Sequence, residues 1–289
     1  CYIDDQMIQM KNIDNWRGMK YMELIAKYRT GFYYDKLDID EKYLYRIIAS
    51  AIGSYRSDVD VDCSDEMVHR VMLAIRYDNP EFFYWSMPEC RRESGKLQLS
   101  YECITNLQSD MAEQCRRVTR EDAADLIKTV RDSRSELVTR LCDENNGSGM
   151  KQWEVLSSMY EYLVNNDEYA WDELETQEKD NWIYEIWGPL IIGKGVCGGI
   201  AQTVNYLCQA VHIPSTLVTG YAALNGERCT HSWNMIKLDG QVYYLDATCE
   251  ICKCAAEKNN RFSVDDAKYF LRTSKEFDAM DYVWSHEFY

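Results

Sequence analysis

Hydrophobic residues in the first half of the chain recur every three or four positions. In residues 40–54, for example, Leu44, Ile48 and Ile52 would share one face of a helix. The next such stretch begins with Ser64, a residue type that commonly caps the N-terminus of a helix. We therefore predict amphipathic helices at residues 40–54, 64–75 and 120–141, and one strand where positions alternate at residues 97–103.

The pattern changes in the second half. Residues 153–163 predict one more helix, and residues 188–199 then contain five glycines before a helical stripe that ends at Val211. Alternating segments follow at residues 216–222, 230–238 and 241–247. The last two are joined by Asp239-Gly240, a pair that favours a two-residue hairpin turn. This half therefore predicts a helix packed on an antiparallel sheet.

A polar, glycine-containing run at residues 143–149 separates the two patterns. We place a domain boundary near residue 149. It divides the chain into a mostly helical N-terminal region, residues 1–149, and a second region, residues 150–289. The N-terminal region shows no catalytic signature.

The hairpin predicts which residues lie together. With a two-residue turn at Asp239-Gly240, opposing positions on the two strands sum to 479. Trp233 then faces Asp246, and His231 is the diagonal neighbour of Asp246 on the same face, about 7–8 Å away at the backbone. A carboxylate can reach an imidazole across that distance, so we predict an oriented His–Asp pair.

Cys197 stands among glycines where a loop meets the start of a predicted helix. A helix N-terminus favours negative charge, which lowers the pKa of a thiol, and flanking glycines let a substrate approach the sulfur. A thiol beside a histidine that a third group orients is the arrangement of an activated nucleophile. We predict Cys197 as the nucleophile, His231 as base and later acid, and Asp246 as the residue that orients His231.

Three segments resemble the motifs of the transglutaminase-like superfamily, in the same chain order. They are Gly193 to Ala201 (GKGVCGGIA), His231 to Asn234 (HSWN) and Tyr244 to Thr248 (YLDAT). The spacings of 34 residues from cysteine to histidine and 15 from histidine to aspartate are also similar to those of the family. The resemblance extends upstream over residues 159–169 and 187–190. More loosely, residues 58–87 resemble the helical N-terminal region of bacterial secreted members.

The resemblance implies an α+β, papain-like fold, with a nucleophile helix on an antiparallel sheet and a mostly helical region before it. It implies acyl chemistry at protein or peptide amides through an acyl-thioester, with no cofactor and no metal. Hydrolysis of peptide or isopeptide bonds is slightly favoured over transglutamination, because bacterial relatives with this layout often look hydrolytic. The backbone N–H of Cys197 would hold the oxyanion, with Trp187 or Gln177 as candidates for a second donor. Cys249 stands where relatives often carry tryptophan.

Two alternatives remain open. A non-catalytic binding or scaffold module would use the same fold, although such relatives usually lose a triad residue and this chain keeps all three. Cys249, Cys252 and Cys254 could bind zinc with Cys229 or Cys208. No second well-spaced pair completes a tetrahedral set, so the zinc hypothesis is the weaker of the two.

Composition limits the partners. With 289 residues, 46% of them hydrophobic, the chain can bury a sizeable core. Its net charge of −16 repels phosphate backbones and argues against a nucleic-acid partner. The longest apolar runs fall short of the roughly 20 residues that a membrane helix needs. We therefore expect a protein or peptide substrate and no transmembrane segment.

The 12 cysteines suggest an oxidising compartment. Cys1 is what a bacterial lipoprotein shows once its signal peptide is cleaved, although an arbitrary start of the sequence explains it equally well. Without Cys1 and Cys197, ten cysteines remain, which is compatible with up to five disulfides. We expect an extracytoplasmic protein, secreted or anchored to the cell surface by a lipid on Cys1; a cytoplasmic location stays open.

Overall fold

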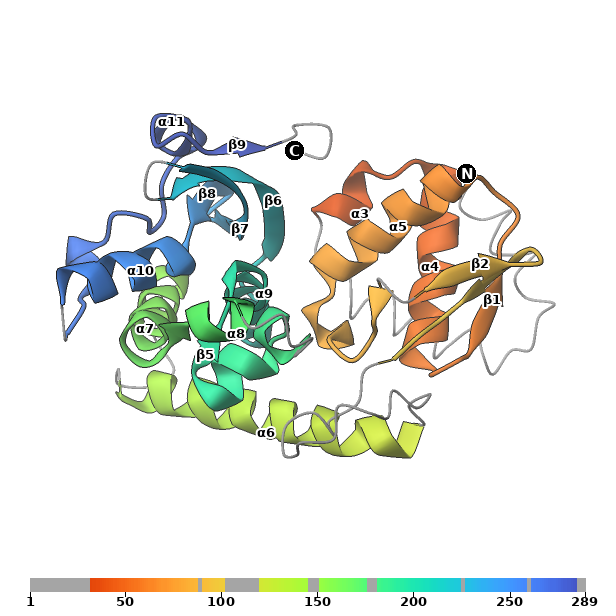
Figure 1. The fold of residues 1–289 in the computed structure, drawn as a ribbon, viewed down its shortest axis with the longest axis horizontal. Helices are drawn as coiled ribbons and strands as arrows, with labels where there is room; N and C mark the ends of the chain where they lie inside the picture. The colour runs from red at the N-terminus through yellow and green to blue at the C-terminus, as the bar shows by residue number, and fades with distance from the viewer. Residues whose placement is uncertain are drawn as a thin grey trace.

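The computed structural model describes residues 32–87, 90–101, 120–144, 151–175, 181–224, 227–258 and 261–284. Helices predominate in the N-terminal region, and helices pack on an antiparallel sheet in the second region (Figure 1). The predicted α+β fold class is therefore confirmed. None of the helices among the described residues is long and apolar enough to cross a membrane.

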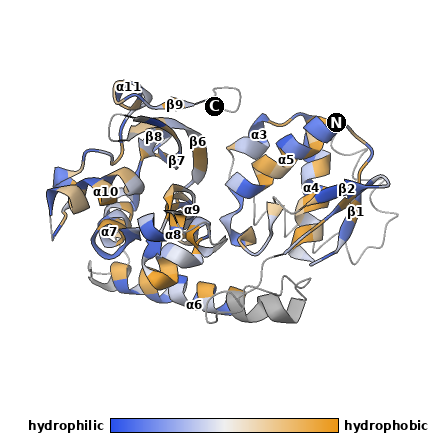
Figure 2. Ribbon diagram, viewed as in Figure 1, coloured by the Kyte–Doolittle hydropathy of each residue, from blue (hydrophilic) through white to orange (hydrophobic). Residues whose placement is uncertain are grey.

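The N-terminal region is built on two amphipathic helices. Ser64 accepts a hydrogen bond from the Met67 N–H at the start of α5, as its place in the sequence predicts. Hydrophobic and hydrophilic residues occupy different faces of α4 and α5 (Figure 2). The strand predicted at residues 97–103 is present, but it is shorter than predicted and spans Lys96–Gln98. The elements are α3 (Tyr33–Lys36), α4 (Ile39–Gly53), β1 (Asp58–Asp60), α5 (Asp65–Asp78), η1 (Pro80–Phe82), β2 (Arg91–Glu93) and β3 (Lys96–Gln98), with the three strands in the order β1-β3-β2.

Helix α6 (Arg120–Glu144) runs beneath both regions (Figure 1). Its Ile127 and Val130 belong to the hydrophobic cluster that contains the N-terminal helices. Its Leu137 and Leu141 belong to the cluster beneath the second region's sheet. One helix thus contributes to both cores. The predicted boundary near residue 149 lies outside the described residues, and the division of domains there stays a prediction.

The second region holds the larger sheet, in the strand order β8-β7-β6-β9. Helix α9 packs on β6 and β7, with α7 and α10 beside it (Figure 1). The elements are α7 (Gln152–Asn166), β4 (Glu168–Tyr169), α8 (Trp171–Glu175), η4 (Asn181–Tyr184), η5 (Gly188–Ile192), β5 (Lys194–Gly195), α9 (Cys197–Ala210), β6 (Ser215–Leu224), β7 (Glu227–Leu238), β8 (Gln241–Leu245), α10 (Ala247–Glu257), η6 (Val264–Asp266), α11 (Ser274–Asp278) and β9 (Val283–Trp284).

The β7–β8 hairpin has the predicted register. Strand pairing runs from Leu238 opposite Gln241 to Asn234 opposite Leu245, so opposing positions sum to 479. It stops there, and the predicted strand 241–247 is two residues too long. The reason is Asp246, whose carboxylate accepts the Cys249 N–H and so begins α10 instead of extending the strand.

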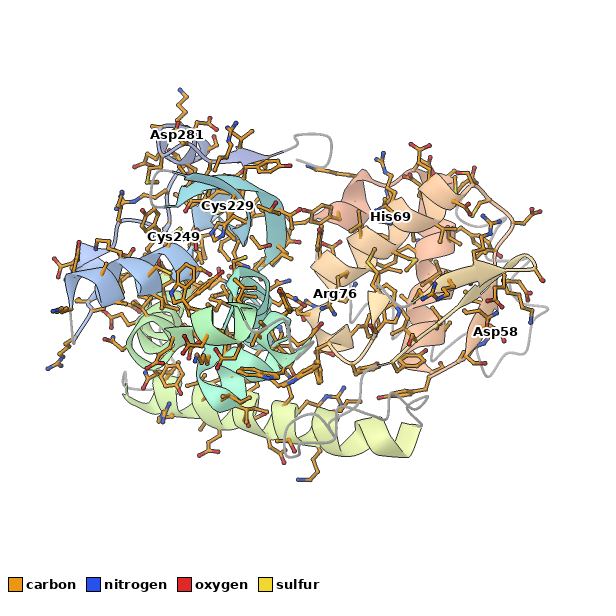
Figure 3. The ribbon with its side chains drawn as sticks, in the orientation of Figure 1. Asp58, His69, Arg76, Cys229, Cys249 and Asp281 are labelled. Atoms are coloured by element: carbon orange, nitrogen blue, oxygen red, sulfur yellow. The ribbon has the colours of Figure 1, made fainter. Side chains whose placement is uncertain are left out.

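Buried and partly buried polar contacts join the N-terminal helices to the second region. The Asn205 amide donates to the Tyr77 carbonyl at 2.8 Å, and the Tyr33 hydroxyl donates to the Leu217 carbonyl at 2.8 Å. Arg76 on α5, labelled in Figure 3, makes two hydrogen bonds, of 2.7 and 2.8 Å, to the carboxylate of Glu185. Glu185 lies in the segment that precedes Cys197 in the chain, so its hydrogen bonds to Arg76 fix that segment to α5.

Candidate active site

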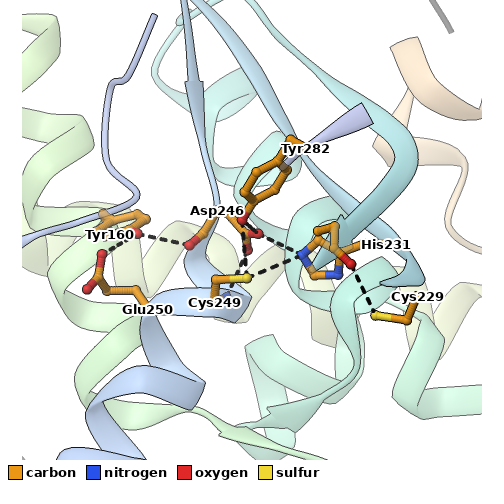
Figure 4. Close-up of polar contacts among 8 residues, drawn as sticks. Tyr160, Cys229, His231, Asp246, Cys249, Glu250 and Tyr282 are labelled. Carbon is orange, nitrogen blue, oxygen red and sulfur yellow. Dashed lines mark hydrogen bonds and ion pairs between the residues drawn. The ribbon is translucent and has the colours of Figure 1, made fainter. Parts of the chain in front are cut away.

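His231 and Asp246 form a buried pair. Nε2 of His231 lies 2.6 Å from Oδ2 of Asp246, and each side chain is only 1% exposed (Figure 4). His231 comes from the middle of β7, and Asp246 follows the last residue of β8. The hairpin register therefore brings together the two residues that the sequence analysis placed as diagonal neighbours.

Burial and charge act in opposite directions on this pair. Burial disfavours the charged imidazole, but the charge of Asp246 and hydrogen bonds to its neighbours outweigh it, so the pKa of His231 is raised well above its usual value. Burial likewise opposes ionisation of Asp246, yet the His231 charge and hydrogen bonds hold its carboxyl pKa below the usual value. The pair is thus stabilised as imidazolium and carboxylate.

Asp246 has two further donors. Its Oδ1 accepts the Cys249 N–H at 2.9 Å, and its Oδ2 accepts the Tyr282 hydroxyl at 2.6 Å (Figure 4). Its backbone carbonyl accepts the Tyr160 hydroxyl at 3.0 Å. Side chain and backbone are therefore fixed from three directions, which leaves the carboxylate little freedom to turn away from His231.

Cys197 is the first residue of α9 and is half-buried. A hydrogen bond with Cys197 is among the causes that raise the pKa of His231, so the thiol and the imidazole are neighbours. Because Nε2 is bonded to Asp246, the ring nitrogen left to take a proton from the thiol is Nδ1. The three residues of the predicted triad are thus brought together, with the thiol at the N-terminus of α9.

Backbone contacts position the cysteine. The Val196 N–H donates to the Ile183 carbonyl at 2.9 Å, which anchors the residue before Cys197 to η4. Gly199 packs against the same carbonyl, because a Cβ there would lie 2.5 Å from that oxygen. The parallel β4–β5 pair brings Tyr169 beside Gly195. The glycines of the motif therefore permit close packing as well as access.

Trp187 and Gln177 are the two candidates for the second oxyanion donor. Among the described residues, no contact joins either of them to the Cys197 thiol. Trp187 is 3% exposed and packs edge-on against Phe83, with ring centroids 6.2 Å apart. Gln177 lies outside the described residues. Either role stays a prediction.

Cys249 lies beside the predicted triad. Its sulfur is 3.7 Å from His231 Nε2 and 3.2 Å from the Tyr282 hydroxyl. Among the described residues, its sulfur, Nε2 of His231 and a carboxylate oxygen of Asp246 lie within 4.8 Å of one another, close enough to hold a metal ion. Hydrogen bonds within the group already occupy these atoms, and the cluster differs from the predicted C-x-x-C-x-C zinc set.

The neighbouring thiols are poor nucleophiles. Burial is the main cause that raises the pKa of Cys249 to about 12 and that of Cys252 to about 11. A buried thiol with such a pKa stays protonated at neutral pH.

One residue of the site carries no usable sequence signal. Tyr282 lies 36 residues after Asp246, in a segment rich in aromatic residues, where a tyrosine is expected in the core. Only folding shows that the Tyr282 hydroxyl points at Asp246.

Comparisons with known proteins agree with the sequence motifs. Residues 139–247 match the Transglutaminase-like superfamily, a range that includes Cys197, His231 and Asp246. No curated protein matches the chain.

Solved structures with a similar arrangement include a TGase, with 15% identity and a TM-score of 0.38 over 67% of this chain and 49% of that one. A candidate cysteine protease from Cytophaga hutchinsonii has 18% identity and a TM-score of 0.33 over 53% and 50%. The periplasmic domain of TgpA from Pseudomonas aeruginosa, bound to ethylmercury, has 19% identity and a TM-score of 0.31 over 45% and 46%. The chain spans about half the length of each.

Proposed function

Because residues 139–247 form a transglutaminase-like superfamily domain, we propose that this chain is a Cys-His-Asp thiol enzyme. It acts on protein or peptide amides through an acyl-thioester on Cys197. The observation that carries the proposal is the buried 2.6 Å pair of His231 and Asp246 with Cys197 as its neighbour. A non-catalytic module has no need of a buried, charged imidazole beside a thiol at a helix N-terminus.

The reaction follows from these positions. The Cys197 thiol has given its proton to Nδ1 of His231, so that a thiolate faces the imidazolium, and the sulfur attacks the amide carbonyl to give a tetrahedral oxyanion. The backbone N–H of Cys197, at the start of α9, is a donor for that oxyanion, and Trp187 or Gln177 is proposed as the second. The imidazolium, held by Asp246, returns its proton to the leaving amine, and the C–N bond breaks to leave the acyl-thioester.

Water or an amine then attacks the thioester. We favour water, and hence hydrolysis of peptide or isopeptide bonds, because Cys197 is only half-buried and solvent needs no binding site to reach it. The neutral imidazole takes a proton from the attacking water, and the Cys197 sulfur leaves. An amine acceptor would give transglutamination by the same steps.

We further propose that the protein works outside the cytoplasm, where oxidising conditions would pair many of its 12 cysteines. Cys1 lies outside the described residues, and no disulfide joins two cysteines within them. The mass of the intact protein with and without reductant, after alkylation, counts its disulfides. A fully reduced protein purified without reductant would remove the argument for secretion and leave the triad untouched.

The activity is tested with a peptide library and a fluorescent amine. Wild type should give cleaved or amine-labelled peptides, and Cys197→Ala should give neither. Cys63→Ala is the matched control, because Cys63 is also half-buried but lies in the N-terminal region. Cleavage without amine incorporation supports hydrolysis. If no product depends on Cys197, the chain is better explained as a binding or scaffold module.

Thiol labelling gives a second readout. Iodoacetamide should modify Cys197 faster than Cys249 and Cys252, and His231→Ala should remove that advantage. Equal, slow labelling of all three thiols would contradict the proposed enzyme.

A further inference from the structure

We propose that Tyr282 is a positioning residue of this site, whose hydroxyl fixes the Asp246 carboxylate so that it holds His231 toward Cys197. The inference rests on the proposed function for its effect on turnover. It concerns a segment that begins well after the matched family range, residues 139–247, has ended.

The contacts define the role. The Tyr282 hydroxyl lies 2.6 Å from Oδ2 of Asp246, the same oxygen that bonds Nε2 of His231 at 2.6 Å (Figure 4). Two short bonds therefore meet at one oxygen and set the rotation of the carboxylate. Without the hydroxyl, the carboxylate would be held only by Nε2 of His231 on Oδ2 and by the Cys249 N–H on Oδ1.

The hydroxyl has a fixed role as donor. It carries one proton and lies 2.6 Å from the carboxylate and 3.2 Å from the Cys249 sulfur. The carboxylate is the stronger acceptor, so Tyr282 donates to Asp246, with the Cys249 sulfur as a weaker acceptor beside it. Burial, together with the charge of Asp246, raises the pKa of Tyr282, which keeps the phenol protonated.

Aromatic packing holds the ring of Tyr282 in place. The side chain is 3% exposed and contacts Phe277 and Trp233, with centroids 4.3 and 5.0 Å away. Strand β9, just after Tyr282, pairs with β6, where Gly220 lies opposite Trp284. A Cβ on Gly220 would lie 2.3 Å from the Val283 carbonyl, so the glycine permits this close approach. The C-terminal segment is thus fixed to the sheet that carries His231.

Tyr282→Phe keeps the ring and removes the hydroxyl. We expect kcat to fall roughly 10-fold, as when a buried group that orients a functional side chain is lost, with KM within about twofold of wild type. Tyr244→Phe is the matched control. Tyr244 is buried in the same aromatic cluster, 5.6 Å from Phe277, and its hydroxyl has no role in our site. The control should keep both constants and the wild-type unfolding temperature, whereas Tyr282→Phe should remain folded but unfold at a lower temperature, because a buried carboxylate loses a donor.

A measurement independent of turnover separates this inference from the proposed function. In Cys197→Ala protein, the proton between His231 and Asp246 is followed by NMR, with and without Tyr282→Phe. A change in its chemical shift for Tyr282→Phe and none for Tyr244→Phe supports the positioning role, even if no substrate is found. An unchanged resonance, or an unchanged kcat in an active enzyme, would overturn it.

Discussion

The histidine and cysteine sides of the site are positioned by different means. On the sheet side, side chains hold one another: His231, Asp246 and Tyr282 are each at most 3% exposed and are joined by hydrogen bonds of 2.6 Å. On the helix side, Cys197 is half-buried, and the backbone around it is packed against the Ile183 carbonyl. The histidine side stabilises a buried charged pair, and the cysteine side holds Cys197 where it remains partly exposed.

The difference has a chemical reason. A charged pair can be buried only when its polar atoms are satisfied, so the histidine side needs a complete network. The proposed nucleophile, Cys197, must contact a substrate, so it cannot be buried as completely as His231 and Asp246. Substitutions on the two sides should therefore have different effects. On the histidine side, stability and activity should fall together. On the cysteine side, the effect should depend on whether the new side chain collides with the backbone.

The largest effect is expected from Asp246→Ala. It leaves His231 buried without its partner and removes the cap of α10. We expect kcat/KM to fall by about 10³-fold or more and the free energy of unfolding to fall by about 3–5 kcal/mol. Urea unfolding and peptide turnover measure the two. Asp265→Ala, at an exposed carboxylate, is the control.

An Asp246→Ala protein as stable as wild type would show that the network on the histidine side contributes nothing to the fold. Full activity in the same variant would remove Asp246 from the triad.

An intermediate effect is expected from Gly199→Ala. Its Cβ would lie 2.5 Å from the Ile183 carbonyl, so α9 or the 181–196 segment must shift, at a cost of about 1–3 kcal/mol. Gly198→Ala is the control within the same helical turn, because its Cβ would meet its nearest atom, the Tyr184 carbonyl, at 4.0 Å. Thermal unfolding and iodoacetamide labelling of Cys197 measure both variants. Equal behaviour of the two would show that backbone packing does not position the thiol.

The histidine–aspartate pair was predictable because it depends on local geometry. Asp239-Gly240 sets the hairpin register, and that register brings Leu245, the residue before Asp246, opposite Asn234 and so near His231. The end of β8 was not predictable in the same way. Asp246 could extend the strand or cap a helix, and the choice is made by the Cys249 N–H and by packing of α10.

Contacts of long sequence separation explain the remaining differences. Tyr282 reaches Asp246 only because β9 pairs with β6, and a two-residue strand leaves no periodic pattern in a sequence. Arg76 and Glu185 are 109 residues apart, and each alone looks like an ordinary surface charge. The glycines around Cys197 did indicate where the nucleophile lies. They did not indicate that Gly199 packs against the Ile183 carbonyl.

The smallest effect is expected in the dependence of stability on pH. The pKa of His231 is raised in the folded state, so its contribution is complete below its ordinary value of 6.5 and is lost as pH rises through the folded value. The pKa of Asp246 is lowered, so its contribution is present above 3.8 and is lost as pH falls through the folded value. The pair should therefore stabilise the fold most between about pH 4 and 6.5, by about 1.4 kcal/mol for each unit of pKa shift. Urea unfolding from pH 4 to 9 should show this maximum in wild type and a flatter profile in Asp246→Asn. Identical profiles would show that the histidine side is held by hydrogen bonds and packing without a contribution from charge, and the contrast with the cysteine side would then be one of burial alone.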